Sequence, residues 1–302
     1  FLASPGPHSE SDWTATADPK TKRNENPPRP ILIMSHLSPS CEESISRIGS
    51  WKLDDGQWRA WSSLDMLDRG FRYGMSVFET VAVHQSRALL LSDHLARFER
   101  AASDCGARLP MIPSFDFSQL GDGLLRFYLT FGPGKPTAPF DGQLYAIFEP
   151  AEVTWNLPDA RVMSCAAPYI SRPGGWKTGN YWQNIDALSA AQRSDCDEAL
   201  LFNPAGMLVS ASMANVFLQM GKKWITPALD CGARDGVVRS WAIAQTGAEE
   251  SLIESEQLQQ ATACFLTNSR YGVRGVAEID GRPLAHLAAP LQKKYRNEIF
   301  DL

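Results

Sequence analysis

The sequence predicts an α+β protein with two domains, and three observations support that expectation. The chain has 302 residues, of which 44% are apolar, so two domains of ordinary size can each bury a core. Segments with the alternating pattern of strands occur on both sides of segments with helical spacing. Residues 150–158 have little regular pattern, as in a connection between domains. We therefore expect a smaller N-terminal α/β domain at residues 49–150 and a larger C-terminal domain at residues 159–302.

Composition narrows the class of function. The net charge of -5 argues against nucleic acid as the main partner, because phosphate neutralisation needs a basic surface. No stretch approaches the roughly 20 consecutive apolar residues of a membrane-spanning helix. The six cysteines are scattered, with no CxxC pair and no Cys/His spacing suited to zinc, which favours a reducing, cytoplasmic compartment without a disulfide framework or a metal. Small molecules therefore remain as the class of ligand that the composition allows.

Residues 1–48 predict a flexible N-terminal extension. They are rich in Ser, Pro, Asn, Glu and Lys, and their one apolar island is Ile31-Leu32-Ile33-Met34. Such a segment cannot bury enough apolar surface to offset the entropy lost on ordering.

The N-terminal domain begins with a predicted hairpin whose turn is Asp54-Asp55-Gly56. Further on, Gly70 and Gly74 stand among aromatic residues, which indicates close backbone approach. An ordinary loop entering the strand at residues 77–83 explains the same residues.

A helix is predicted after a short buried strand at Leu89-Leu90-Leu91, with Ser92 as its cap and its end at Gly106. His94 and Arg97 are three residues apart and share one face. An arginine in the first helical turn opposes the helix dipole unless an anion compensates it. Arg97 is therefore either a candidate phosphate ligand or a solvated surface arginine.

The rest of the chain is predicted to form short strands and three more helices. The segment at residues 236–239 begins a helix with a glycine and free backbone N–H groups, which form a ready anion site. A further helix is predicted at residues 184–193, and a last one directly after the turn at residues 279–282. Strands are predicted at residues 124–131, 143–149, 160–166, 199–202, 215–220, 224–226 and 263–267.

Lys177 is the centre of the functional interpretation. It is framed by Trp176, Gly179 and Tyr181, and a helical segment and a buried-strand pattern follow. This setting is what a Schiff-base lysine would have, although a surface lysine is the ordinary alternative.

The ordered series of motifs resembles the class IV, fold type IV family of pyridoxal-phosphate enzymes, which includes branched-chain aminotransferases, D-amino acid aminotransferases and aminodeoxychorismate lyases. No single motif is specific, but their order is. The matching pieces lie at residues 68–74, 77–80, 94–97, 177–181, 197–201, 212–217, 226–227 and 236–239.

The resemblance implies a two-domain, D-amino acid aminotransferase-like fold with pyridoxal 5'-phosphate at the domain interface. Lys177 would form the imine and move a proton at the substrate carbon. Tyr181 would bind the phenolic oxygen of the cofactor, although core packing is the alternative. The phosphate would be held by Arg97, the backbone amides of Val237 and Val238, and Ser269.

Two departures from the family pattern concern the cofactor ring. Ser210 stands where members usually carry a glutamate that keeps the pyridine nitrogen protonated, and a serine cannot supply that charge. Arg234 stands where a leucine packs on the ring. Arg234 either reaches the ring, where it would disfavour protonation further, or points to solvent.

On the substrate side the resemblance singles out Tyr73, Phe78 and Arg126. Arg126 would contact a substrate carboxylate or form a salt bridge at the domain interface. Glu79 followed by Thr80, and not by glycine, leans toward the lyase and D-amino acid branches.

These inferences predict a homodimeric aminotransferase that moves an amino group between an amino acid and a 2-oxo acid. The first alternative is an aminodeoxychorismate lyase-type elimination that gives 4-aminobenzoate and pyruvate, because elimination tolerates a weaker electron sink. The second is a catalytically impaired relative with a binding or structural role.

Overall fold

The computed structural model describes residues 49–118, 120–151, 157–171 and 175–300. These residues belong to one compact unit. The predicted N-terminal extension at residues 1–48 lies outside the described residues. The described strands form two sheets, one from strands that precede residues 152–156 in the sequence and one from strands that follow them. The division into two domains at 49–150 and 159–302 stays a prediction.

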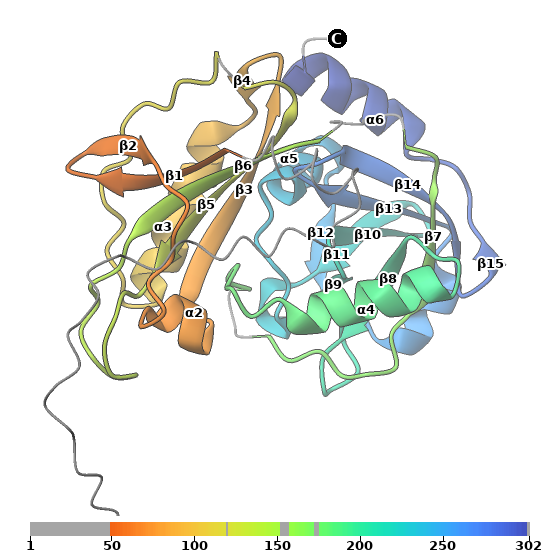
Figure 1. Cartoon of the computed structure of the whole chain (residues 1–302). Helices are drawn as coiled ribbons and strands as arrows, with labels where there is room; N and C mark the ends of the chain where they lie inside the picture. Colours follow the sequence, from red (N-terminus) through yellow and green to blue (C-terminus); the bar gives the residue numbers. More distant parts are fainter. Residues whose placement is uncertain (1–48, 119, 152–156, 172–174, 301–302) are drawn as a thin grey trace, which may run out of the picture. The chain divides into compact units, whose positions relative to one another are not determined.

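The first sheet is antiparallel and, in the described part of the chain, has six strands in the order β2-β1-β6-β5-β3-β4 (Figure 1). Its long central strands are paired in register, with Phe78 opposite Tyr128 and Thr80 opposite Arg126. The strands are β1 (Gly49–Asp54), β2 (Gln57–Ala60), β3 (Ser76–His84), β4 (Arg87–Ala88), β5 (Gly123–Thr130) and β6 (Leu144–Pro150).

The second sheet is mixed, and its described strands follow the order β12-β11-β10-β13-β14-β7-β8-β9, with β15 paired to β14. Parallel pairs join β7 to β8 and to β14. The strands are β7 (Ala160–Ser164), β8 (Glu198–Phe202), β9 (Leu208–Ala211), β10 (Asn215–Met220), β11 (Lys223–Pro227), β12 (Glu249–Ser251), β13 (Ala263–Asn268), β14 (Gly272–Ile279) and β15 (Arg282–Pro283).

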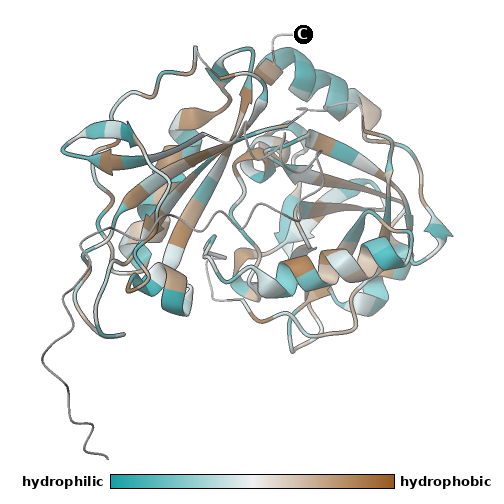
Figure 2. Cartoon of the chain, viewed as in Figure 1, coloured by the Kyte–Doolittle hydropathy of each residue, from teal (hydrophilic) through white to brown (hydrophobic). Residues whose placement is uncertain are grey.

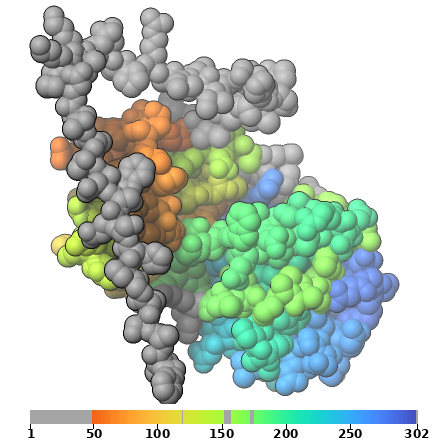
Figure 3. Space-filling view, turned by 60° about the horizontal axis from the view of Figure 1, so that its bottom comes forward, coloured from red at the N-terminus to blue at the C-terminus, as the bar shows by residue number. Residues whose placement is uncertain are grey.

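Helices accompany both sheets, which confirms the α+β class. They are α2 (Arg69–Tyr73), α3 (Leu91–Asp104), α4 (Trp182–Arg193), α5 (Val237–Thr246) and α6 (Ala289–Tyr295). Within the described residues, no helix is long and apolar enough to cross a membrane. Figure 3 shows α4 in green at the surface.

Each sheet has its own core. Phe98 and Ala102 of α3 pack with Val81, Leu125 and Phe127 of the first sheet. In the second sheet the interior is built around strand residues such as those of β8, β10 and β13. Brown apolar residues gather along the strands of both sheets in Figure 2. Burial of these faces is the main favourable term in folding.

The structure corrects the predicted start of α3. The strand β4 ends at Ala88, and the run that follows is a turn, because Leu90 takes a left-handed conformation (φ 53) and caps the helix without a side-chain bond. Ser92 lies inside the helix and is not its cap. Arg97 is consequently in the second turn, not the first. The predicted strand at Leu89-Leu90-Leu91 was wrong because a buried apolar run packs equally well in a turn.

The C-terminal prediction also needs one correction. The turn at Asp280-Gly281 closes a hairpin with β15, and α6 begins only at Ala289. The short helix α2 lies where the sequence indicated either close backbone approach or an ordinary loop, and no helix was predicted there. Two charged residues at its start are structural. Asp68 caps α2, and Arg69 donates to backbone carbonyls of the 131–139 loop, including Gly132 (3.1 Å) and Pro139 (2.7 Å).

Candidate active site

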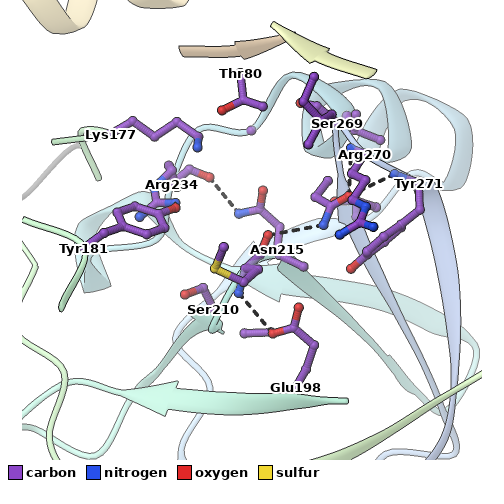
Figure 4. A pocket seen from close by; sticks show the side chains of 18 of the residues that line it. Thr80, Lys177, Tyr181, Glu198, Ser210, Asn215, Arg234, Ser269, Arg270 and Tyr271 are labelled. Carbon is purple, nitrogen blue, oxygen red and sulfur yellow. Dashed lines mark hydrogen bonds between the residues drawn. The ribbon is translucent and has the colours of Figure 1, made fainter. Parts of the chain in front are cut away.

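A pocket of about 650 Å³ is lined by residues from both sheets (Figure 4). From the first sheet come Phe78 and Thr80 of β3 and Arg126 of β5. The second sheet contributes Ser210 of β9 and Asn215 of β10, together with loop and helix-start residues. Such concave sites with a few convergent polar groups are the usual form of small-molecule sites.

Lys177 is held in this pocket by backbone pairing with the first sheet. The amide of Phe78 donates to the carbonyl of Lys177 (2.8 Å), and the amide of Gly179 donates to the carbonyl of Ser76 (3.0 Å). Gly175 has a positive φ of 57 and packs so tightly that an added Cβ would lie 2.4 Å from the carbonyl oxygen of Ala233. The lysine segment is therefore fixed on both sides.

The Lys177 amine faces aromatic rings. Its Nζ lies 4.2 Å from the ring centroid of Phe78 and 5.4 Å from that of Tyr181. Burial lowers the pKa of Lys177, and the cation of Arg234 lowers it further. A lowered pKa increases the share of the neutral, nucleophilic amine at neutral pH.

Arg234 and Tyr181 form a pair beside this lysine. The Nη1 of Arg234 donates to the Tyr181 hydroxyl, and its Cζ lies 5.1 Å from the Tyr181 ring centroid. Burial alone would raise the pKa of the Tyr181 phenol, but the charges of Lys177 and Arg234 outweigh it and lower the pKa to about 8. Of the two orientations considered for Arg234, the structure has the one that lines the pocket wall, not the one in solvent.

Arg97 lies at the other end of the pocket and is not a solvated surface residue, since its side chain is 13% exposed. Its Nε and Nη2 donate to the two carboxylate oxygens of Glu79, and its Nη1 donates to the carbonyl of Asp235 (2.8 Å). The anion that compensates Arg97 is thus Glu79. A guanidinium has five N–H donors, so two are left for a ligand.

The same carboxylate organises His94 and, through it, Ser269. His94 Nδ1 lies 2.9 Å from Glu79 Oε1, and His94 Nε2 lies 3.4 Å from Ser269 Oγ. Burial would raise the pKa of Glu79, but Arg97 and His94 hold it well below its usual range. Burial lowers the pKa of His94, so its ring is neutral at neutral pH.

The first turn of α5 faces the same end of the pocket. Gly236 is the N-cap residue, so the amides of Val237 and Val238 are among the helix-start groups without an intrahelical acceptor. Asn215 supports this turn, because its Nδ2 donates to the Arg234 carbonyl (2.8 Å) and its Oδ1 occupies the space of a Gly236 side chain. Arg97, Ser269 and these two amides together form a donor set that fits a phosphate.

Ser210 and Glu198 lie on the floor of the pocket. Ser210 sits on β9 opposite Leu201 and is half-buried. Glu198 accepts from the Met213 amide (3.0 Å) and from the Ser212 hydroxyl, and burial raises its pKa to about 7. Glu198 contacts the Ser212–Ala214 segment and is a carboxyl group that sequence reasoning did not select.

The residues predicted for the substrate side are not all brought together. Phe78 lines the pocket, but Tyr73 is 41% exposed at the end of α2 and is not among its lining residues. Arg126 lines the pocket and also forms an ion pair with Glu149. That pair joins β5 and β6, which are neighbouring strands of the first sheet.

Sequence reasoning passed over Glu79, Glu198 and Asn215 as site residues. For Glu79 a signal was present, because an acidic residue on a strand face shared with Val77 and Val81 needs a buried cationic partner. The shared face of His94 and Arg97 offered that partner.

The fold and the pocket define an α+β protein whose two sheets both line one site, with a lysine at one end and phosphate-type donors at the other. Residues 76–279 match the profile of the family described as Amino-transferase class IV. The chain belongs to this class IV aminotransferase family.

Among its relatives, the aminodeoxychorismate lyase of Bacillus subtilis is 26% identical over 79% of this chain and 90% of its own. The D-alanine aminotransferase of Bacillus licheniformis is 23% identical over 80% of this chain and 92% of its own. A branched-chain aminotransferase structure from Thermoproteus uzoniensis superposes with a TM-score of 0.72 at 22% identity, covering 82% of this chain and 94% of that one. The predicted fold type IV architecture is confirmed.

Proposed function

We propose that this chain is a pyridoxal-phosphate-dependent aminotransferase that moves an amino group between an amino acid and a 2-oxo acid. The observation that carries the proposal is the Lys177 amine with a lowered pKa, in one pocket with Arg97 and the helix-start amides. When bound, the cofactor supplies an aldehyde that condenses with amines and a ring that withdraws electrons from the substrate carbon.

The place of each residue in the pocket determines its proposed role. Lys177 would supply the amine that holds the cofactor and, once free, the base that would move a proton at the substrate carbon. Tyr181 would hold the ring oxygen of the cofactor. The phosphate would be held by Arg97, the amides of Val237 and Val238, and Ser269.

The test is to add pyridoxal phosphate to the purified protein, follow the absorbance of the lysine adduct, and reduce it with borohydride. We expect one labelled lysine, Lys177, and none in Lys177→Ala. Lys223→Ala, at an exposed lysine paired with Glu249, is the control and should label as wild type. A colourless protein without adduct would sink the enzyme proposals and support a catalytically impaired relative.

A lyase of the aminodeoxychorismate type is the second candidate, and Ser210 is the observation in its favour. Ser210 offers no charge to keep the pyridine nitrogen protonated, and elimination tolerates a weaker electron sink than transamination. The 26% identity to a lyase is consistent with this. Pyruvate release from aminodeoxychorismate, measured against keto-acid formation from an amino-acid panel, decides between the two.

We also propose that the protein is a homodimer. Apolar side chains are exposed before and within α2 and on α4, among them Leu67 (61%), Phe71 (55%) and Trp182 (84%). Large exposed apolar patches mark interaction sites. Light scattering after gel filtration should give twice the 33.4 kDa chain mass for the wild type. A mass of one chain at micromolar concentration contradicts the proposal.

A cytoplasmic location is proposed with it. The six cysteines are scattered along the sequence without a CxxC pair, a pattern that favours a reducing compartment over a disulfide framework. Fractionation of the native source, with the chain followed by antibody, tests the location.

A further inference from the structure

The basic residues that line the pocket differ in how their charge is balanced. Three of them have a carboxylate partner: Arg97 with Glu79, Arg126 with Glu149, and Arg274 with Asp197 at 2.9 Å. The remaining basic lining residues are Lys177, Arg234 and Arg270.

Arg270 is exposed and stands beside Ser269, at the phosphate end (Figure 4). Arg234 is on the opposite side, with Lys177 and Tyr181. These two arginines therefore face different parts of a ligand.

Within the described residues, Arg234 has no carboxylate partner, and its side chain donates only to the Tyr181 hydroxyl. Its buried Nε has no hydrogen-bond partner there either. Burial opposes the charge of Arg234, but the oxygens of Tyr181 and Tyr169 outweigh it and keep the pKa above its ordinary value. The pocket thus holds a guanidinium whose charge and donors the protein leaves partly unsatisfied, which is costly unless a ligand completes it.

The position of Arg234 relates it to the reacting end of the pocket. Its Cζ and the Lys177 Nζ lie 5.1 Å and 5.4 Å from the centroid of the same Tyr181 ring. Both cations thus lie beside one ring on the same side of the pocket, and Arg234 borders the space in which a ligand would react at Lys177 (Figure 4). A planar guanidinium matches the planar carboxylate that amino acids carry on their reacting carbon.

We propose that Arg234 binds the substrate carboxylate next to the reacting carbon and thereby selects amino acids over amines that lack it. This inference rests on the proposed aminotransferase function. It gives the substitution of arginine for the family's leucine a positive role, since the carboxylate would meet a cation at the wall of the pocket.

The binding experiment uses benzoate and its neutral isostere benzamide as probes, measured by calorimetry on the full chain with and without pyridoxal phosphate. Arg234→Leu carries the residue that the family pattern has at this position, so it is expected to fold. We expect wild type to bind benzoate more tightly than benzamide. In Arg234→Leu the ratio of the two dissociation constants should fall by about tenfold to hundredfold, which is the range for hydrogen bonds to charged groups. Arg234→Lys should keep part of this preference. The exposed Arg193→Leu is the charge-matched control and should keep all of it.

Two outcomes overturn the proposal: wild type that binds both probes equally, or Arg234→Leu that keeps the preference. If Arg126→Leu loses the preference in place of Arg234→Leu, the carboxylate site is at Arg126. Because lysine labelling by pyridoxal phosphate is measured separately, a failure of the proposed function is distinguishable from a failure of the Arg234 site.

A kinetic experiment completes the test in the loaded enzyme. For Arg234→Leu we expect KM for the best amino acid to rise about tenfold or more while kcat changes less, and KM for the matching decarboxylated amine to stay unchanged. A fall in kcat with unchanged KM would instead assign Arg234 a role on the cofactor ring and contradict substrate binding.

Discussion

Glu79 balances the phosphate end of the pocket from inside the first sheet. Its carboxylate binds Arg97 through both oxygens and His94 through one of them, and its side chain is only 2% exposed. Removing one partner of such a buried pair leaves a charge uncompensated.

Glu79→Gln should therefore lower the free energy of unfolding by about 3 kcal/mol in urea denaturation at pH 7. The exposed pair of Arg59 and Asp54 (3.3 Å) gives the control, and Asp54→Asn should change stability by less than about 0.5 kcal/mol. Equal effects of the two substitutions would mean that the Glu79 pair contributes little.

Glu198 predicts that the stability of the protein depends on pH. Its pKa in the folded protein is about 7, above the ordinary 4.5, so its contribution to stability is full below pH 4.5 and is lost as the pH rises through 7. Relative to Glu198→Gln, wild type should thus lose up to roughly 3 kcal/mol between pH 4.5 and 8, at about 1.4 kcal/mol per pKa unit. Urea denaturation of both proteins across this range checks it, and parallel pH profiles would contradict it.

For single residues, the sequence predicted which side chains line the pocket better than it predicted the partners that those side chains bind. The order of motifs pointed to Lys177, Arg97 and Tyr181, which the structure brings into one pocket. It did not reveal that Glu79 neutralises Arg97, because that contact joins a strand and a helix and depends on their packing. A motif alone did not place Tyr73 correctly, because its side chain is exposed at the end of α2 and does not line the pocket.

Among the elements, the first turn of α5 depends on its close approach to Asn215 at the start of β10. An ideal Cβ on Gly236 would lie 2.1 Å from Asn215 Oδ1 and 3.1 Å from the Cβ of Arg239. The side chain of Asn215 cannot move freely, since it also binds the Arg234 carbonyl.

Gly236→Ala should consequently destabilise the protein by about 1–3 kcal/mol and weaken phosphate binding, because the helix-start amides shift. Gly121→Ala is the matched control, since an added Cβ there meets no atom within 4 Å. Thermal denaturation with and without inorganic phosphate measures both effects. An unchanged response to phosphate would show that the α5 amides do not bind it.

Elements were predicted well where periodicity was long and poorly where it was short. The strands around residues 124–131, 143–149, 199–202, 215–220 and 263–267 are present within a residue or two. The three-residue run Leu89-Leu90-Leu91 contains too few residues to separate a strand from a turn. The helix cap was predicted two residues too late, at Ser92, because Leu90, which has no capping side chain, ends the turn with a left-handed backbone.

On the scale of the whole compact unit, one pocket is lined by both sheets, so its ligand contacts residues far apart in the sequence. A ligand that binds only the folded state stabilises it by mass action. At one hundred times its Kd, pyridoxal phosphate should raise the free energy of unfolding by about 2.7 kcal/mol. Lys177→Ala should retain a smaller increase through the phosphate donors. Calorimetry over a concentration series checks this, and a melting temperature independent of the cofactor would contradict it.

The pairing of the lysine segment with β3 has a consequence for the folding pathway. The bridge between Val77 and Thr178 joins residues about one hundred positions apart, and contacts of such separation form late because chain closure costs entropy. Until then the Lys177 amine is in water, with the ordinary reactivity of a lysine. In refolding experiments the capacity to label Lys177 should therefore appear after most secondary structure has formed, so that the reactive amine is created by one of the last steps of folding.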